Sequence, residues 1–322
     1  MYTSLKGFKT SRGVRMKYLF SKTVVAGLFF LQQGAPDLIL TNGKVISVDE
    51  RFTIAQAVAI KGDRFLAVGS NQEITALAGP NTKRIDLRGR SVVPGMIDNH
   101  THLMRAGETW TEEVRLDGIE SRKQAVDMLR AKAQAASPNQ WIITLGGWTH
   151  HQFADDKRVF SRQEMDEIAP NNPMLLQEAY YRLYLNSRAI QALALDKMAE
   201  SWIGRDAAGK PTGIVEEAGT RIIAAKIPAP SKQIFEASTL AMIKDFNRAG
   251  LTAVGSAGCP NDQMEVYRRL QQEGRLNLRV FCIVSFPATD AKQVDTVLPR
   301  ISSFRVMSTS TPPFMENRSI SR

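Results

Sequence analysis

Short apolar runs alternate with turn signals over residues 37–93, a pattern typical of a small β-rich unit. In DLILTNGKVISVD the dipeptide Asn42-Gly43 separates two apolar runs, and in AQAVAIKGDRFLAVG the dipeptide Gly62-Asp63 does the same. Asn, Asp and Gly accept the positive φ angles of tight turns, so both segments predict hairpins. A helical pattern over residues 71–78 and a further strand pair in KRIDLRGRSVV complete the unit, which ends near Val93.

After Pro94 the apolar spacing changes to strands that alternate with helices. Ser121 opens an amphipathic helix in which Gln124 completes a capping-box pattern, and a second long helix runs from Ser231 to about Ala249. Further elements are strands at QWIITLGGW, NPMLLQEAY, LTAVGSAG and NLRVFCIVS and a helix over residues 262–273. This alternation favours a parallel βα array, so we expect an α/β fold over residues 94–304.

The basic charge of the chain is concentrated at its ends. The 322 residues carry a formal net charge of +10. Residues 1–36 contain six lysines and arginines and no acid, and residues 305–322 contain three arginines and one glutamate. The middle of the chain is therefore close to neutral, and a uniform basic face for phosphate binding has no support. We expect no nucleic-acid partner.

Residues 1–36 have the order of a secretory signal. From Met16 a basic start precedes an apolar run from Val24 to Leu31, and small residues follow. This run is shorter than the roughly 20 residues that cross a bilayer, so no stable membrane span is expected. The segment predicts a periplasmic or secreted protein, and the alternative is a cytoplasmic protein with a disordered leader.

Cys259 and Cys282 are the two cysteines of the chain. They are too few to hold together a scaffold with a small core, and they do not form a CxxC pair. We interpret both as buried thiols.

His100 and His102 lie one residue apart at the end of an apolar run, in SVVPGMIDNHTHLMRAG. Side chains two positions apart on a strand point to the same face, so both imidazoles would project together with Asp98 while Thr101 faces away. Two imidazoles at this spacing can bind one divalent ion. Two structural histidines remain the alternative on spacing alone.

The context of the histidines resembles the amidohydrolase superfamily, in which a β-rich N-terminal segment runs into a metal-bearing barrel. The branch called amidohydrolase family 3, which includes N-substituted formamide deformylases, is the most similar. The resemblance covers residues 37 to about 304 and is carried by VVPGMIDNHTHL, WIITLGGW, APNNPMLL, YLNSRAI, DAAGKPTGIVEEA and AGLTAVGSAG, in that order.

This resemblance implies an N-terminal β-sandwich segment over residues 37–93 and a partial TIM-like (β/α) barrel over residues 94–304. It also implies that His100 and His102 are ligands of Zn²⁺ or another divalent metal. The implied reaction is hydrolysis of a non-peptide carbon-nitrogen bond in a small amide or formamide by a metal-activated water. The oligomeric state is left open.

Other polar residues fit the resemblance less directly. Many relatives have a histidine where this chain has Tyr181, and we expect Tyr181, Trp148 and Asn186 to contact substrate. The alternatives are a packed aromatic face and, for Asn186, a cap on the following helix. His150 and His151 precede the strands from which later metal ligands are expected, so a structural or substrate-contact role is the prediction for them.

Residues 305–322 show neither the apolar spacing of a strand nor that of a helix, and this polar segment predicts a disordered tail. Residues 305–320 can be encoded by permitted codons whose bases, when translated from two bases further along, give GDVYIDTALYGESIY. This alternative translation is similar to the sequence that relatives carry at this point. We therefore expect a one-base deletion near the codon of Arg305 and a C-terminally truncated hydrolase with little activity. The alternative is a non-catalytic domain that binds a metal or a partner.

Overall fold

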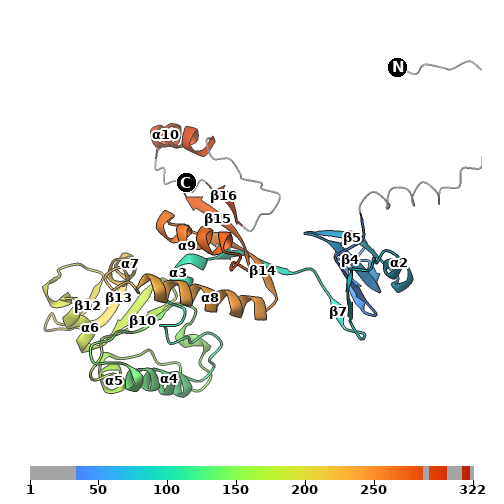
Figure 1. Ribbon diagram of the computed structural model, residues 1–322. Helices are drawn as coiled ribbons and strands as arrows, with labels where there is room; N and C mark the ends of the chain where they lie inside the picture. The colour runs from blue at the N-terminus through green and yellow to red at the C-terminus, as the bar shows by residue number, and fades with distance from the viewer. Residues whose placement is uncertain (1–33, 286–289, 303–313, 320–322) are drawn as a thin grey trace, which may run out of the picture. The chain divides into compact units, whose positions relative to one another are not determined.

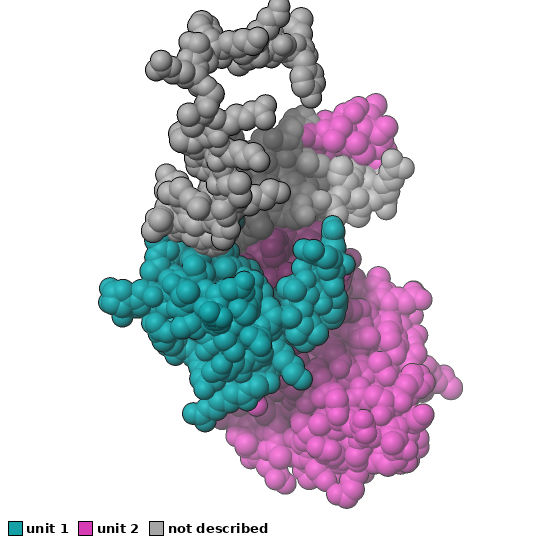
Figure 2. Space-filling model, turned by 90° about the vertical axis from the view of Figure 1, so that its right-hand side faces the viewer, with its two compact units in different colours: residues 1–94 teal, residues 95–322 magenta. Residues whose placement is uncertain are grey.

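The computed structural model describes residues 34–285, 290–302 and 314–319 of the chain. The chain has a mixed α/β fold and divides into two compact units, residues 1–94 and 95–322, which Figure 2 shows in different colours. Within the described ranges no helix is both long and apolar enough to cross a membrane. The predicted secretory run lies outside the described residues.

Over residues 34–94, the described part of the first unit, the chain forms two small sheets and one helix. One sheet has the strand order β5-β4-β1-β6 and the other β3-β2-β7. Ser70 and Glu73 form a capping box at the start of the helix, so the helix predicted over residues 71–78 is confirmed. The elements are β1 (Leu38–Thr41), β2 (Lys44–Ile46), β3 (Ile54–Ala55), β4 (Ala57–Lys61), β5 (Arg64–Gly69), α2 (Asn71–Ala76), β6 (Lys83–Asp86) and β7 (Ser91–Val92).

The two predicted hairpin turns differ in outcome. Gly62-Asp63 joins the antiparallel strands β4 and β5, and Gly62 has a φ of +57°, so this hairpin is confirmed. Asn42-Gly43 instead connects a strand of one sheet to a strand of the other, because β1 pairs with β4 and β6 whereas β2 pairs with β3 and β7. A Cβ atom at Gly43 would lie 2.3 Å from Leu87 Cδ1, so this glycine serves close packing. The predicted strand pair β6 and β7 is likewise divided between the two sheets.

The second unit contains a four-stranded parallel sheet with the order β16-β15-β14-β8. Figure 1 shows α8 and α9 beside this sheet, and a buried cluster that includes Leu103, Met242, Val254 and Tyr267 fills the contact. The elements are β8 (Met96–Thr101), α3 (Leu103–Thr109), α8 (Lys232–Arg248), β14 (Leu251–Ala257), α9 (Asn261–Gln272), β15 (Arg279–Ser285), α10 (Ala291–Ser302) and β16 (Phe314–Ser319).

The strand β16 falls within the segment predicted to be a disordered tail. Residues 314–319 pair in parallel with β15, from Val280 opposite Phe314 to Ser285 opposite Ser319. The disorder prediction is therefore wrong for these six residues. The remainder of the predicted tail, residues 305–313 and 320–322, lies outside the described residues.

A second sheet in the same unit has the order β12-β13-β11-β10-β9. The strands predicted at QWIITLGGW and NPMLLQEAY belong to it and not to the sheet of β8. A turn of three residues joins β10 to β11, which forces an antiparallel pair, because a parallel pair needs a long crossover. The elements are α4 (Arg122–Ala135), β9 (Ile142–Leu145), η1 (His150–Gln152), α5 (Arg162–Ile168), β10 (Met174–Glu178), β11 (Arg182–Leu185), α6 (Ser187–Ala192), η2 (Leu195–Lys197), β12 (Ile203–Arg205), β13 (Pro211–Glu216) and α7 (Ala218–Ala224).

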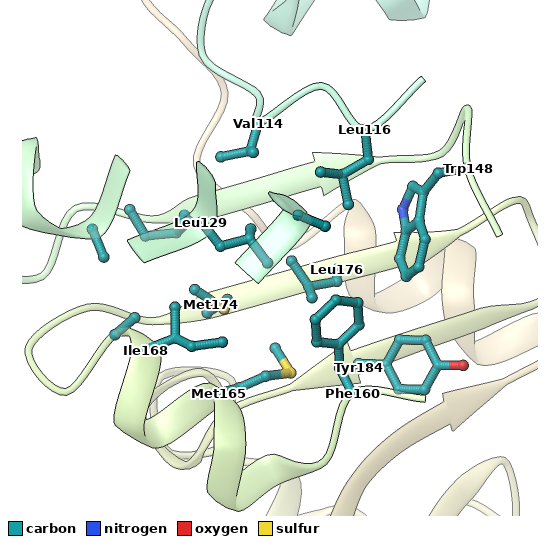
Figure 3. Packing of buried hydrophobic residues seen from close by; sticks show 14 of the residues in the cluster. Val114, Leu116, Leu129, Trp148, Phe160, Met165, Ile168, Met174, Leu176 and Tyr184 are labelled. Atoms are coloured by element: carbon teal, nitrogen blue, oxygen red, sulfur yellow. The ribbon is translucent and has the colours of Figure 1, made fainter. Parts of the chain in front are cut away.

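An apolar cluster packs α4 and α5 against this second sheet (Figure 3). Leu129, Met165 and Leu176 are fully buried within it, together with the ring of Tyr184. Burial of such side chains provides roughly 1.5–3 kcal/mol each, so the second sheet has its own hydrophobic core.

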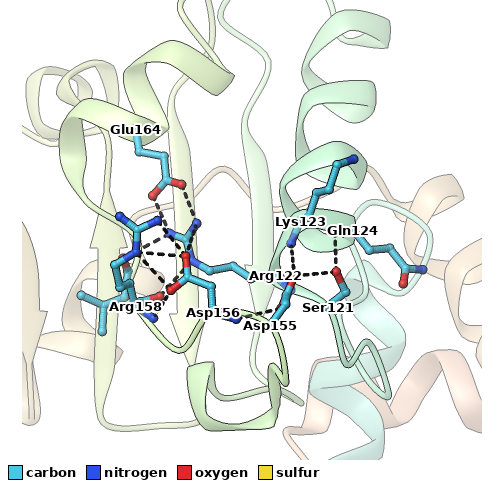
Figure 4. A network of polar contacts seen from close by, with 9 residues as sticks. Ser121, Arg122, Lys123, Gln124, Asp155, Asp156, Arg158 and Glu164 are labelled. Carbon is cyan, nitrogen blue, oxygen red and sulfur yellow. Dashed lines mark hydrogen bonds and ion pairs between the residues drawn. The ribbon is translucent and has the colours of Figure 1, made fainter.

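A polar network fixes the loop after η1 to the start of α4 (Figure 4). The Arg122 guanidinium is 5% exposed and donates to both carboxylate oxygens of Glu164, at 2.7 and 2.6 Å. Asp155 accepts from the Arg122 and Lys123 backbone N–H groups and from the Ser121 hydroxyl, which together hold the pKa of Asp155 well below its usual range. These bonds anchor the segment that carries His150.

Cys259 and Cys282 form a disulfide, so the prediction of two buried thiols is wrong. Cys282 lies in β15 opposite Ser256 of β14, and Cys259 follows β14 by two residues. Parallel pairing of the two strands brings the Cα atoms to 5.9 Å, a spacing that a disulfide can span. The sequence separation of 23 residues gave no sign of this pairing.

Candidate metal centre

His100 and His102 lie at the carboxyl end of β8, where functional sites of parallel sheets form. His100 is in the strand and His102 is the residue before α3. Their ring centroids are 5.6 Å apart with an interplanar angle of 88°. The Asp98 carboxylate accepts from the His100 backbone N–H at 2.9 Å, which turns it toward the main chain. The structure therefore brings both predicted ligands together.

The neighbouring strand orients His102. Its Nδ1 atom lies 3.0 Å from the Ala257 carbonyl oxygen at the end of β14. A carbonyl oxygen only accepts hydrogen bonds, so Nδ1 carries the proton and the Nε2 lone pair is left for a ligand. A Cβ atom at Gly255 would lie 2.6 Å from the Asn99 carbonyl oxygen, so glycine allows β14 to approach β8 here.

Tyr180, which the sequence did not single out, contacts His102. The ring centroids of the two residues are 5.3 Å apart. The predicted substrate residue, Tyr181, is 45% exposed and its ring lies 5.9 Å from the guanidinium carbon of Arg182. Ala179, before both tyrosines, has a φ of +46°, and this turn decides which tyrosine faces the histidines. The sequence showed two adjacent tyrosines but not the turn.

Trp148, in the loop after β9, and Asn186, between β11 and α6, are both buried beside the second sheet. The Trp148 ring packs against Phe153, Phe160 and Tyr184, at centroid distances of 6.1, 5.7 and 6.4 Å. Its Nε1 atom has no hydrogen-bond partner among the described residues.

Asn186 is fully buried and its amide is fully used. Its Oδ1 accepts from the Met174 and Ala189 N–H groups, and its Nδ2 donates to the Ala169 and Asn172 carbonyl oxygens. Asn186 therefore caps α6, which is the alternative stated for it. Saturation of the amide leaves no group for substrate, which corrects the substrate-contact prediction for this residue.

A buried carboxylate holds His150. The Glu178 Oε1 atom accepts from the His150 backbone N–H at 3.0 Å and lies 2.6 Å from His150 Nδ1, and Oε2 accepts from the Tyr184 hydroxyl at 2.5 Å. Burial raises the pKa of Glu178, but hydrogen bonds from Tyr184, His150 and Tyr181 outweigh burial and hold the pKa below its usual value. A carboxylate at the end of a buried apolar strand was the available signal, and the sequence interpretation missed it.

The donor set around His100 and His102 fits part of a metal site. In the part of the chain that the structure describes, no group of three or more His, Cys, Asp or Glu side chains is arranged to hold a metal ion. Catalytic zinc sites usually take three protein ligands. The two imidazoles therefore supply an incomplete ligand set.

A cavity of about 420 Å³ lies next to Tyr180. Its walls include Arg105 from α3, Gln177 and Tyr180 from the β10–β11 hairpin, and Glu217 and Arg221 at the start of α7. Because Tyr180 also contacts His102, the cavity adjoins the candidate metal centre.

Comparison with known proteins gives a consistent match. The sequence profile of the amidohydrolase family matches residues 83–303. The chain is 30% identical to N-substituted formamide deformylase of Arthrobacter pascens, over 74% of this chain and 46% of that protein. It is 30% identical to Protein LONG AFTER FAR-RED 3 of Arabidopsis thaliana, over 58% of this chain and 32% of that protein.

A solved structure shares the fold. The crystal structure of an uncharacterized metal-dependent hydrolase from Pyrococcus furiosus superposes with a TM-score of 0.55 and 22% identity. The match covers 82% of this chain and 52% of that chain. The chain thus spans about half the length, or less, of the relatives it matches.

Proposed function

The chain belongs to the amidohydrolase family, and from that membership we propose a divalent-metal hydrolase site at His100 and His102. The proposed metal is Zn²⁺, and the proposed substrate is a small amide or formamide with a non-peptide carbon-nitrogen bond. The observation that carries the proposal is the pair of imidazoles at the carboxyl end of β8, with His102 oriented by the Ala257 carbonyl. The name of the Arthrobacter relative supports the choice of bond.

The residues of this chain have defined roles in the proposal. His102 presents Nε2 because its Nδ1 donates to Ala257, and His100 is held by the bond from its backbone to Asp98. The Tyr180 ring lies against one side of the His102 ring, with the ring centroids 5.3 Å apart. When bound, a divalent ion supplies a Lewis acid for the substrate carbonyl and lowers the pKa of water to about 7.

The wider architecture is part of the same proposal. We take the sheet β16-β15-β14-β8 as part of a (β/α) barrel and the two sheets of the first unit as part of a β-sandwich. Parallel pairing of the four strands, with α9 and α10 between successive strands, supports the barrel. Likeness to the fold of the Pyrococcus hydrolase supports it as well.

A second candidate is a metal-binding domain that does not hydrolyse substrate. The observation that favours it is the incomplete set of ligands among the described residues. The two candidates are separated by assaying the purified zinc-loaded chain for amine release from a panel of formamides and amides. Turnover that disappears in the His100→Asn/His102→Asn variant supports the hydrolase. Zinc binding without turnover supports the second candidate.

We also propose export from the cytoplasm. The disulfide between Cys259 and Cys282 supports this location, because disulfides persist in oxidising compartments and are rare in the cytosol. Cell fractionation tests the location: recovery of the chain only in the cytosol, with both thiols free, would contradict it.

A further inference from the structure

The cavity beside Tyr180 contains two arginines that have no carboxylate partner. Arg105 and Arg221 both line it. Among residues 34–285, 290–302 and 314–319, neither guanidinium forms an ion pair, although Glu217 also lines the cavity. The charged side chains of the cavity therefore sum to one positive charge.

Arg105 is held in place by neutral groups. Its Nη1 donates to the Leu145 carbonyl oxygen at 2.6 Å and its Nη2 donates to Gln177 Oε1 at 2.9 Å. Its guanidinium carbon lies 5.5 Å from the centre of the Tyr180 ring. These contacts fix the guanidinium plane and leave three of its five N–H donors for another group.

A half-buried cation that is held by two hydrogen bonds and has no counter-ion is unusual, since buried charges are normally paired. The contacts of Arg105 reduce the conformational entropy that its side chain would lose on binding a ligand. Because the guanidinium is planar, it favours a ligand with a planar pair of oxygens. Arg221, which is exposed and also lines the cavity, adds a second charge. Together they match a carboxylate, which arginine binds through two parallel hydrogen bonds.

We infer that this cavity binds a carboxylate group of the substrate, so that the amide hydrolysed at His100 and His102 is an anionic one, such as an N-acyl amino acid. Tyr180 contacts both His102 and Arg105, and it separates the anion site from the histidine pair. This inference rests on the proposed function for the reacting end of the substrate. Recognition of the carboxylate itself needs no metal.

The test uses two ligands that differ in charge alone. Isothermal titration calorimetry of the full, EDTA-treated chain compares N-acetylphenylalanine with N-acetylphenylalanine amide at low ionic strength. The expected result is binding of the carboxylate roughly tenfold to a hundredfold tighter than the neutral amide. Arg105→Gln is expected to remove most of that preference, and Arg221→Gln to reduce it several-fold.

Controls separate charge recognition from unfolding. Arg105→Gln also removes bonds to Leu145 and Gln177, so its melting temperature is measured in parallel. Arg221→Gln breaks no ion pair between described residues and keeps the test valid if Arg105→Gln unfolds. Arg248→Gln removes the same charge from α8, where the Arg248 side chain is 77% exposed, and should leave the preference unchanged.

Equal affinity for the two ligands, binding of neither, or a preference that survives both arginine substitutions would overturn the inference. The outcome is independent of turnover. Carboxylate preference without hydrolysis would contradict the proposed function alone, and hydrolysis of neutral amides without a charge preference would contradict the anion site alone.

Discussion

The Nδ1 atom of His102 lies 3.0 Å from the carbonyl oxygen of Ala257, which joins the end of β8 to the end of β14. Because the carbonyl can only accept, we predict that neutral His102 carries its proton on Nδ1. Long-range ¹H–¹⁵N correlation spectra of the metal-free chain distinguish the two tautomers. His151, whose ring forms no hydrogen bond with another described residue, serves as the comparison. A His102 signal typical of the Nε2–H tautomer would contradict the geometry.

The buried carboxylate Glu178 should contribute to stability at neutral pH. Replacing it in Glu178→Gln weakens the bonds from His150 and Tyr184, and we expect a loss of roughly 1–3 kcal/mol in the free energy of unfolding at pH 7. Urea denaturation measures this loss. Glu200→Gln, at an exposed position, is the matched control.

The effect of Glu178→Gln should also depend on pH. Because the pKa of Glu178 is lower in the folded chain than in the unfolded chain, its contribution is present above the unfolded pKa of about 4.3. It is lost as the pH falls through the folded pKa. The stability difference between wild type and variant should therefore shrink between pH 6 and pH 3, and a constant difference would count against the assignment.

The disulfide should stabilise the second unit. Closing a loop with a sequence separation of 23 residues gives about 3 kcal/mol by the chain-entropy estimate. Cys259→Ala is expected to lower the free energy of unfolding by about this amount, and reduction of wild type should lower it similarly. Thiol titration in denaturant, before and after reduction, checks the bond: two free thiols before reduction would show that it does not form.

The second sheet should depend on its own core. Leu176→Ala removes a fully buried side chain from the cluster under α4 and α5, and we expect a cost of roughly 2–5 kcal/mol. Ile222→Ala, at a position that is 45% exposed, should cost much less. Guanidinium denaturation of both variants gives the comparison, and similar losses would mean that the cluster is not packed as described.

Local sequence patterns predicted local structure well. Ser121 and Ser231 mark helix starts as predicted, and Gly62-Asp63 makes the expected hairpin. Asn42-Gly43 has a stronger hairpin signal but joins two sheets, because strand pairing depends on residues far away in the chain. The residues of a turn determine its backbone conformation, whereas tertiary packing determines which strands pair with each other.

The candidate site was predicted only in part for a similar reason. The spacing of His100 and His102 is a local signal, and the structure brings their rings together. Arg105, Tyr180 and Glu178 make their contacts with residues that lie 28 to 78 positions away in the sequence, and local spacing does not predict such contacts. The pairing of Cys259 with Cys282 was missed on the same grounds.

The central claim is that His100 and His102 hold a divalent metal ion. Equilibrium dialysis of the purified chain against Zn²⁺, followed by elemental analysis, tests it most directly. We predict that wild type and His151→Asn retain the same zinc content and that His100→Asn/His102→Asn loses it while keeping its far-ultraviolet circular dichroism. Unchanged zinc content in the double variant would contradict the account.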